Sequence, residues 1–351
     1  MVTFSRVHRR RSLYQVLLSV ALYTWTVLAF SGQFHLAATT SARGFVLPLS
    51  TTAKAFVRRG ARRAFKHQTI LEKAAAQVFG ETKTEAASIS SSVTTLSPSY
   101  EEDIRKFLAS KRSELKSSSS LLEQFHIQGW RWHTKSLARD AGRLHRLALK
   151  TDVKTAETLK DASDFVIGFN MMGLHNVEAT LFFPWMKEKL VGGFQEKSDL
   201  STGFSSAMDV LETDRRTVAK LGETISKRAR LACDMKESES CRSDAIVEVA
   251  NYSAELQNLV QRMISIEDNL LVPAVGAIVP VKEQKSFNNK VLRKLGLLNS
   301  RLHLVGMYET VWEDNDSKEK ELFQQAIPGI SRNMIPRWKR KLYQPKTYMM
   351  E

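Results

Sequence analysis

The stretch GFNMMGLHNVEATLFFPWM, residues 168–186, sets apolar side chains three or four residues apart and places His175 and Glu178 among them. In an α-helix, one face of this stretch would be formed by Gly168, Met172, His175, Ala179 and Phe182. A buried charge without a partner costs roughly several kcal/mol, so Glu178 needs a partner inside the core. The stretch therefore predicts a helix packed in a helical core and marks one place for chemistry.

Three further segments repeat this spacing, and the four helices are expected at 118–150, 154–190, 203–233 and 242–274. Short breaks separate them. No segment shows apolar and polar residues alternating with the period of two that is typical of strands. The sequence therefore predicts an all-α fold, an antiparallel up-down-up-down four-helix bundle over residues 99–276. Additional helices are expected at 100–115, after the cap residue Ser99, and at 287–312 and 318–327 in a C-terminal part, 277–351.

Most of the formal net charge of +15 belongs to the N-terminal part of the chain. The first 71 residues hold 11 Lys and Arg and no acidic residue, so residues 72–351 carry only +4. The bundle therefore lacks the basic surplus of a nucleic-acid-binding domain, and no nucleic-acid partner is predicted.

Residues 1–44 are typical of a signal peptide, because arginines precede an apolar run at 14–30. Residues 45–98 begin as a transit-peptide-like segment, rich in Ser, Thr, Ala and Arg, and end as a Ser/Thr-rich linker. Signal followed by transit resembles the two-part address of algal plastids, so we expect a plastid location by way of the secretory pathway. Ordinary secretion, or a leader kept as a membrane anchor, are the alternatives.

Each expected bundle helix carries polar side chains on its apolar face. In chain order these are His126 and His133, then His175 and Glu178, then Arg215, and finally Glu267. The charged members must meet one another, a metal ion or water.

Two of these helices also carry a recognisable motif. His175, Glu178 and the ending LFFP at 181–184 resemble the second-helix motif HHxxEExxxFP of hemerythrin-like (HHE cation-binding) domains. Glu267, Asp268 and Pro273 are similar to the fourth-helix motif HxxxEExxxxP. The resemblance covers roughly residues 118–275, and 334–345 looks like the tail of algal proteins of this group. It implies a bundle in which His and carboxylate side chains from all four helices hold two irons.

The motif is incomplete, because Leu174, Arg215 and Met263 stand where the family places histidines. A complete five-histidine oxygen-binding site is therefore excluded. One hypothesis is that the Arg215 guanidinium lies between Glu178 and Glu267 and keeps both ionised. The chain would then be a structural or interaction module with an unknown protein partner and no metal.

The alternative hypothesis is a mononuclear site for iron or another divalent metal. Its ligands would be His133 or His126, together with His175, Glu178 and Glu267. The protein would then bind iron or respond to iron or oxygen. A redox enzyme built on this site has no further feature in its favour.

The sequence contains no nucleophile elbow, phosphate loop, dinucleotide fingerprint or metalloprotease motif, so the chain is predicted not to be an enzyme. His126 taken alone, and His303 beyond the bundle, are expected to be structural. Cys233 and Cys241 are equally compatible with a disulfide and with free thiols. The basic tail is expected to be solvated or to strap the bundle, with contact to an anionic membrane as the weaker alternative.

Overall fold

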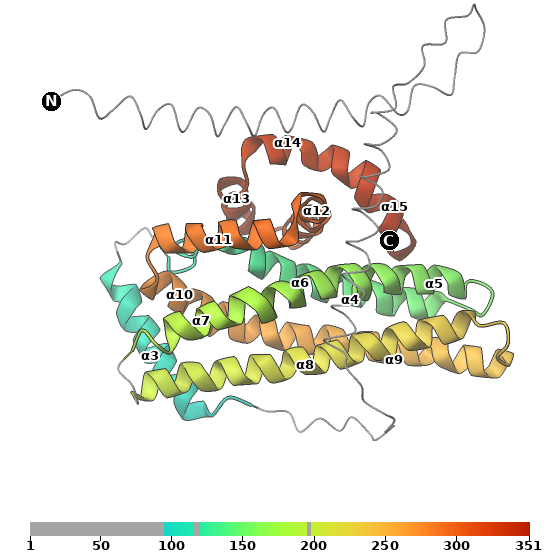
Figure 1. Ribbon diagram of the computed structural model, residues 1–351, viewed down its shortest axis with the longest axis horizontal. Coiled ribbons are helices and arrows are strands. Elements are labelled where there is room, and N and C mark those ends of the chain that lie inside the picture. Colours follow the sequence, from blue (N-terminus) through green and yellow to red (C-terminus); the bar gives the residue numbers. More distant parts are fainter. Residues whose placement is uncertain (1–94, 116–119, 195–197) are drawn as a thin grey trace, which may run out of the picture. The chain divides into compact units, whose positions relative to one another are not determined.

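The computed structural model describes residues 95–115, 120–194 and 198–351, so the predictions about the leader lie outside the described residues. These residues form helices and contain no strand, which confirms the all-α class for this part of the chain (Figure 1). The first described helix, α3 (Pro98–Glu114), confirms the helix expected at 100–115. The cap expected at Ser99 is wrong, because Ser97 holds the cap position and Pro98 begins the helix.

Four long helical runs form the body of the molecule (Figure 1). They are α4 (Gln128–Lys150); α5 (Ala156–Ser163) continued by α6 (Met172–Val177) and α7 (Phe183–Leu190); α8 (Asp199–Cys233); and α9 (Glu239–Ile266) continued by α10 (Val272–Ile278). The most extensive contacts run between α4 and α9 and between α8 and α9, and α5 packs on α8. A single hydrophobic core fills the space between the runs and includes Leu144, Phe182, Phe204, Leu211, Leu256 and Leu271.

Two of the runs contain wide, π-helical turns that begin at the two core glutamates. Glu178–Phe182 precedes Pro184, and Glu267–Leu271 precedes Pro273. Proline has no N–H to donate to the preceding turn, so the regular hydrogen-bond pattern cannot continue across it. Such turns are common at functional sites. A third π-helical segment, Asp164–Met171, lies earlier in the same run as Glu178.

The helix starts differ from the expected ones where side chains cap the backbone. Ser198 and Ser238 accept hydrogen bonds from the N–H groups of Ser201 and Cys241, so α8 and α9 begin before 203 and 242. The prediction that a helix begins at 118 is wrong. Residues 121–127 are turn and irregular backbone, closed by the Gln128 amide, which donates to carbonyl groups of this loop.

A C-terminal layer, residues 281–351, lies on one side of the long runs (Figure 1). It consists of α11 (Val281–Leu295), α12 (Leu297–Glu313), α13 (Ser317–Ala326), α14 (Gly329–Trp338), the π-helical segment Lys339–Tyr343, α15 (Gln344–Thr347) and a final turn. The single helix expected at 287–312 is divided at Gly296, whose φ of 74° favours glycine. The tail is helical, and Tyr343, Thr347 and Met350 are buried. It therefore straps the long runs.

None of the described helices alone is long and apolar enough to cross a membrane; Glu239–Ile278 and Val281–Leu295 meet that test only as a pair bent by 119°.

Candidate site inside the helical core

Four of the predicted site residues are buried in the core. Glu178 is 0% exposed and Glu267 is 1% exposed, and His133 and His175 are also buried. Helix α4 carries His133, α6 carries His175, and the two π-helical turns carry the glutamates. The pKa shifts below link His133 with His175 and Glu178 with Glu267, and the charge of Arg215 acts on both His175 and Glu178.

Glu178 has one carboxylate oxygen bound and one unbound. Its Oε1 accepts a hydrogen bond of 3.0 Å from the Trp130 indole N–H, while Oε2 is buried without a hydrogen-bond partner. Burial raises the pKa of Glu178 to about 7, although the Trp130 N–H and the charge of Arg215 oppose the rise. Glu178 is therefore poised between its charged and neutral forms near neutral pH.

Burial also raises the pKa of Glu267. This pKa lies well above the usual value, and the charges of Glu178 and Asp268 add to the effect. The Thr134 hydroxyl and the charge of Arg131 oppose it. The Oε1 atom of Glu267 also lacks a partner, so the core holds two buried carboxyl groups with raised pKa values that act on each other.

Arg215 lies on α8 but does not bond either carboxylate. Among the described residues it forms no hydrogen bond, and no ion pair within 4.0 Å, with Glu178 or Glu267. Its Nε is buried without a partner, and its guanidinium carbon lies 5.9 Å from the centre of the Phe183 ring. The prediction that Arg215 bonds both carboxylates and keeps them ionised is therefore wrong. The positive charge of Arg215 acts from a distance, by lowering the pKa of Glu178.

His133 belongs to a hydrogen-bonded chain that leaves the core. Its Nε2 lies 2.9 Å from Oδ1 of Asn170, whose Nδ2 donates to Oδ2 of Asp140 at 2.8 Å. Arg139 donates to the other Asp140 oxygen and, at 2.6 Å, to the Tyr343 hydroxyl in the C-terminal layer. Burial lowers the pKa of His133 to about 4, against the effect of Asn170. His133 is therefore a neutral imidazole committed to a protein partner.

His175 is buried without such a partner, because its Nε2 forms no hydrogen bond. Burial lowers its pKa to about 3, and the charges of Arg215 and His133 add to the effect. His126, in contrast, is half-buried in the loop before α4, so its place on the first bundle helix was wrong. Burial and then the charge of Lys285 lower the pKa of His126. Its electrostatic surroundings therefore differ from those of the core site.

His303 of α12 was expected to lie beyond the bundle, but it reaches the core from the C-terminal layer. Its ring centre lies 4.4 Å from that of His133, and it stacks on Phe169 at 4.3 Å. The approach depends on Gly173, where a Cβ atom would lie 2.6 Å from the His303 ring. Burial lowers the pKa of His303 well below its usual value. Gly173, two residues before His175, was the only signal in the sequence that another helix packs closely against this part of the chain.

The arrangement was compared with what a metal ion requires. Within the part of the chain that the structure describes, no three His, Cys, Asp or Glu side chains form a group that could hold one. His133 directs its Nε2 to Asn170. The buried His and Glu atoms of the core site that lack a partner are His175 Nε2, His303 Nδ1, Glu178 Oε2 and Glu267 Oε1. These residues therefore do not fit a preformed iron site.

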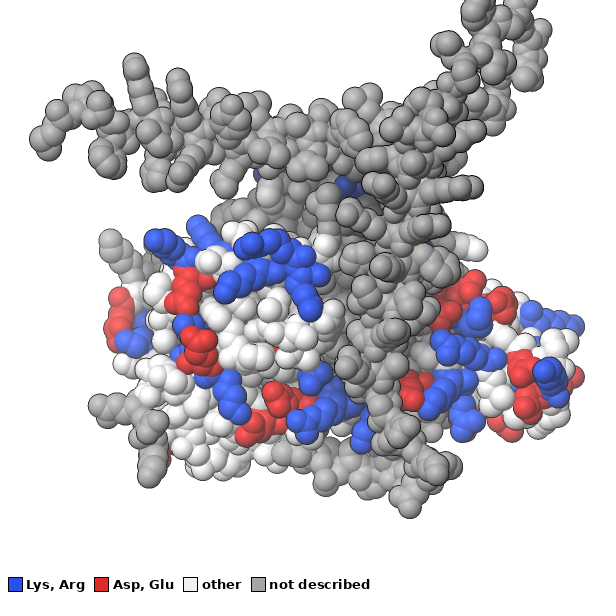
Figure 2. Space-filling model, viewed as in Figure 1, with Lys and Arg blue, Asp and Glu red and all other residues white. Residues whose placement is uncertain are grey.

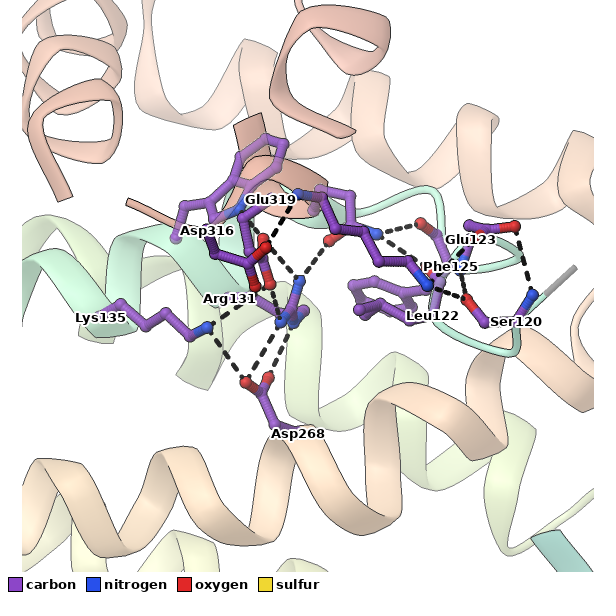
Figure 3. A network of polar contacts seen from close by, with 12 residues as sticks. Ser120, Leu122, Glu123, Phe125, Arg131, Lys135, Asp268, Asp316 and Glu319 are labelled. Atoms are coloured by element: carbon purple, nitrogen blue, oxygen red, sulfur yellow. Dashed lines mark hydrogen bonds and ion pairs between the residues drawn. The ribbon is translucent and has the colours of Figure 1, made fainter. Parts of the chain in front are cut away.

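A second buried polar cluster lies on another face of α4 (Figure 3). Arg131 contacts Asp268 at 2.7 Å and Glu319 of α13 at 2.7 Å, and Lys135 lies 3.3 Å from Asp268. The Trp132 indole N–H donates to Glu319 at 2.9 Å. We call Arg131, Trp132, Lys135, Asp268 and Glu319 the Arg131 network.

The chain was also compared with known proteins. No protein-family model, no curated protein and no solved structure matches it.

Proposed function

We propose that this chain is a hemerythrin-like helical-bundle protein that works as a structural or interaction module in a plastid, with no metal and no catalytic role. In this proposal α4, α5–α7, α8 and α9–α10 form the up-down-up-down bundle. The contacts of α9 with α4 and α8, and of α5 with α8, support that arrangement. The motif resemblance supports the ancestry, and ancestry alone does not carry function.

The observation that carries the proposal is the hydrogen-bonded chain from His133 to Tyr343. His133, which the metal hypothesis would use as a ligand, instead binds Asn170, and the chain continues to Asp140 and Arg139. Arg139 also donates to the backbone carbonyl of Gly306. The core polar groups therefore attach the C-terminal layer to the long helices, which is a structural role.

Metal analysis of the purified full chain tests this proposal. After incubation with Fe(II) and dialysis, we expect well under one iron per chain and no ligand-field or charge-transfer absorption. The matched variants are His175→Ala, in the core, and His126→Ala, in the half-buried loop. Stoichiometric iron in the wild type and in His126→Ala, but not in His175→Ala, would overturn the proposal.

The second candidate function is a mononuclear binding site for iron or another divalent metal. The unpartnered atoms of His175, Glu178 and Glu267 favour it, because buried polar atoms are rarely left without a partner. These residues would hold the ion with His133 after its bond to Asn170 is released. Because burial raises the pKa of Glu178 to about 7, Co(II) must displace a proton from Glu178 at lower pH, so Co(II) affinity should rise between pH 6 and pH 8, with a visible Co(II) spectrum. A pH-independent absence of binding would exclude this candidate.

The plastid location is tested separately with a fluorescent protein fused behind the full chain. We expect fluorescence in the plastid, and a signal confined to the cytosol would refute this part of the proposal.

A further inference from the structure

The outward face of the C-terminal tail differs from the rest of the described surface. Residues 329–347 form one continuous run through α14, the π-helical segment and α15. Ile335 and Tyr343 point inward and are buried. Helical spacing places Ile330, Arg337 and Lys341 on the opposite, exposed face.

This part of the chain is basic and lacks acidic residues that would balance the charge. Residues 322–350 contain six Lys and Arg and no acidic residue. Lys339 forms an intramolecular ion pair with Glu309 at 2.5 Å. The other five form no ion pair within 4.0 Å with a described residue and are exposed: Arg332, Arg337, Arg340, Lys341 and Lys346. Their positive charge is therefore available to an outside partner.

The tail also exposes large apolar side chains. Ile330 is 70% exposed and Tyr348 is 66% exposed, and Leu342 is exposed as well. Figure 2 shows a further group of Lys and Arg over α11, a helix that holds five basic residues and one acidic residue. Both α11 and α14 pack on α12. Residues 281–351 hold 14 Lys and Arg and 8 Asp and Glu, so the C-terminal layer has a surplus of positive charge.

We propose that the outward face of residues 329–348 binds the surface of an anionic lipid bilayer. Basic side chains contribute on the order of 1 kcal/mol each near such a surface, and interspersed apolar side chains enter the headgroup region. A nucleic acid would use the charges but leave Ile330 and Leu342 without a role. The proposal names the partner of the interaction module and rests on the C-terminal layer being attached to the long helices.

A fluorophore on the tail gives a local readout that binding by the leader cannot imitate. In the full chain carrying Cys233→Ser and Cys241→Ser, an NBD label is attached at Ile330→Cys. The matched control carries the label at Met235→Cys, an apolar residue that is 80% exposed in the turn between α8 and α9. With vesicles of 70% phosphatidylcholine and 30% phosphatidylglycerol, we expect a blue shift and brighter emission at 330 only.

Charge and apolar variants then separate the two contributions. Arg337→Glu, Arg340→Glu and Lys341→Glu together should raise the lipid concentration for half-maximal response at least about tenfold. The matched control, Arg216→Glu, Lys220→Glu and Lys227→Glu on exposed positions of α8, should leave it within about twofold. A second pair of substitutions, Leu342→Ser and Tyr348→Ser, should weaken vesicle binding but not binding to heparin.

Three results would overturn the proposal: no response at residue 330, equal effects of the two charge-reversal variants, or loss of heparin and vesicle binding in parallel when the apolar residues are replaced. The last result would indicate a general polyanion surface. Iron retention would overturn the proposed metal-free module without changing these responses, so failures of the two proposals can be told apart.

Discussion

Glu267 and Asp268 are neighbours in the chain, but they belong to two buried regions with opposite electrostatics. Glu267 faces the core site with Glu178, where both carboxyl pKa values are raised. Asp268 faces the Arg131 network with Glu319 (Figure 3). Burial alone would raise the pKa of Glu319, but the hydrogen bonds and charge of Arg131, together with Trp132 and Lys135, outweigh burial and lower it.

The difference lies in how each arginine is placed. Arg131 reaches Asp268 and Glu319 directly, with contacts of 2.7 Å to each. Arg215 bonds neither core carboxylate, and of these two groups its charge lowers the pKa of Glu178 but does not act on Glu267. A buried acid therefore stays ionised when a guanidinium bonds it, whereas a nearby positive charge without a bond leaves burial as the stronger effect.

The largest expected effect comes from removing the direct contacts of Arg131. Arg131→Met leaves two acids without their buried partner, and we expect a loss of about 3–5 kcal/mol in the free energy of unfolding. Urea denaturation at pH 7 measures it. Arg215→Met is the matched control and should cost under about 1 kcal/mol, because Arg215 forms no ion pair with the core acids. Equal losses would contradict the comparison.

A smaller loss is expected when the charge of Glu319 alone is removed. Glu319→Gln should cost about 1.5–3 kcal/mol at pH 7, the range for hydrogen bonds to charged groups. The folded-state pKa of Glu319 is lowered, so its stabilisation is present above the unfolded value and is lost as pH falls through the folded value. Denaturation midpoints of wild type and variant should therefore converge in acid, and a constant difference would argue against an ionised Glu319.

The same substitution at Glu267 should have the opposite sign. Its folded-state pKa is raised, so the folded protein keeps a proton that the unfolded chain releases, and wild-type stability falls as pH rises above about 4.5. Glu267→Gln mimics the protonated form and should stabilise the protein at pH 8, with a gain that grows by at most about 1.4 kcal/mol per pH unit.

Thermal unfolding of this variant at pH 5 and pH 8 tests the sign. The gain should be clear at pH 8 and small at pH 5. If Glu267→Gln destabilises the protein at pH 8 as Glu319→Gln does, Glu267 is ionised in the folded state and the two regions are alike.

The comparison also shows what the sequence could predict. Apolar spacing correctly placed His133, His175, Glu178 and Glu267 on buried faces, because a stripe at steps of three and four marks the face toward the main core. It did not reveal the Arg131 network. Arg131 lies off that stripe of α4, and it is buried because the C-terminal layer covers a second face of the same helix.

Other differences have the same origin in tertiary contacts. His303 enters the core only because α12 packs on α4, and no pattern within α12 announces it. The separation of Arg215 from the carboxylates depends on side-chain positions that helical spacing does not fix. The late start of α4 follows from the Gln128 amide binding the carbonyl groups of Leu122 and Phe125, which closes the preceding loop.

The smallest expected effect concerns the link between the core site and the C-terminal layer. Tyr343→Phe removes the hydroxyl that accepts from Arg139 at 2.6 Å, while Arg139 keeps Asp140 and the Gly306 carbonyl. We expect a loss of about 0.5–1.5 kcal/mol in the free energy of unfolding. Amide hydrogen exchange should become faster in 339–347 and stay unchanged in α8 and α9. The exposed Tyr348→Phe is the matched control and should change neither quantity. If both variants behave alike, the chain from His133 does not hold the layer in place, and its attachment rests on the buried apolar side chains instead.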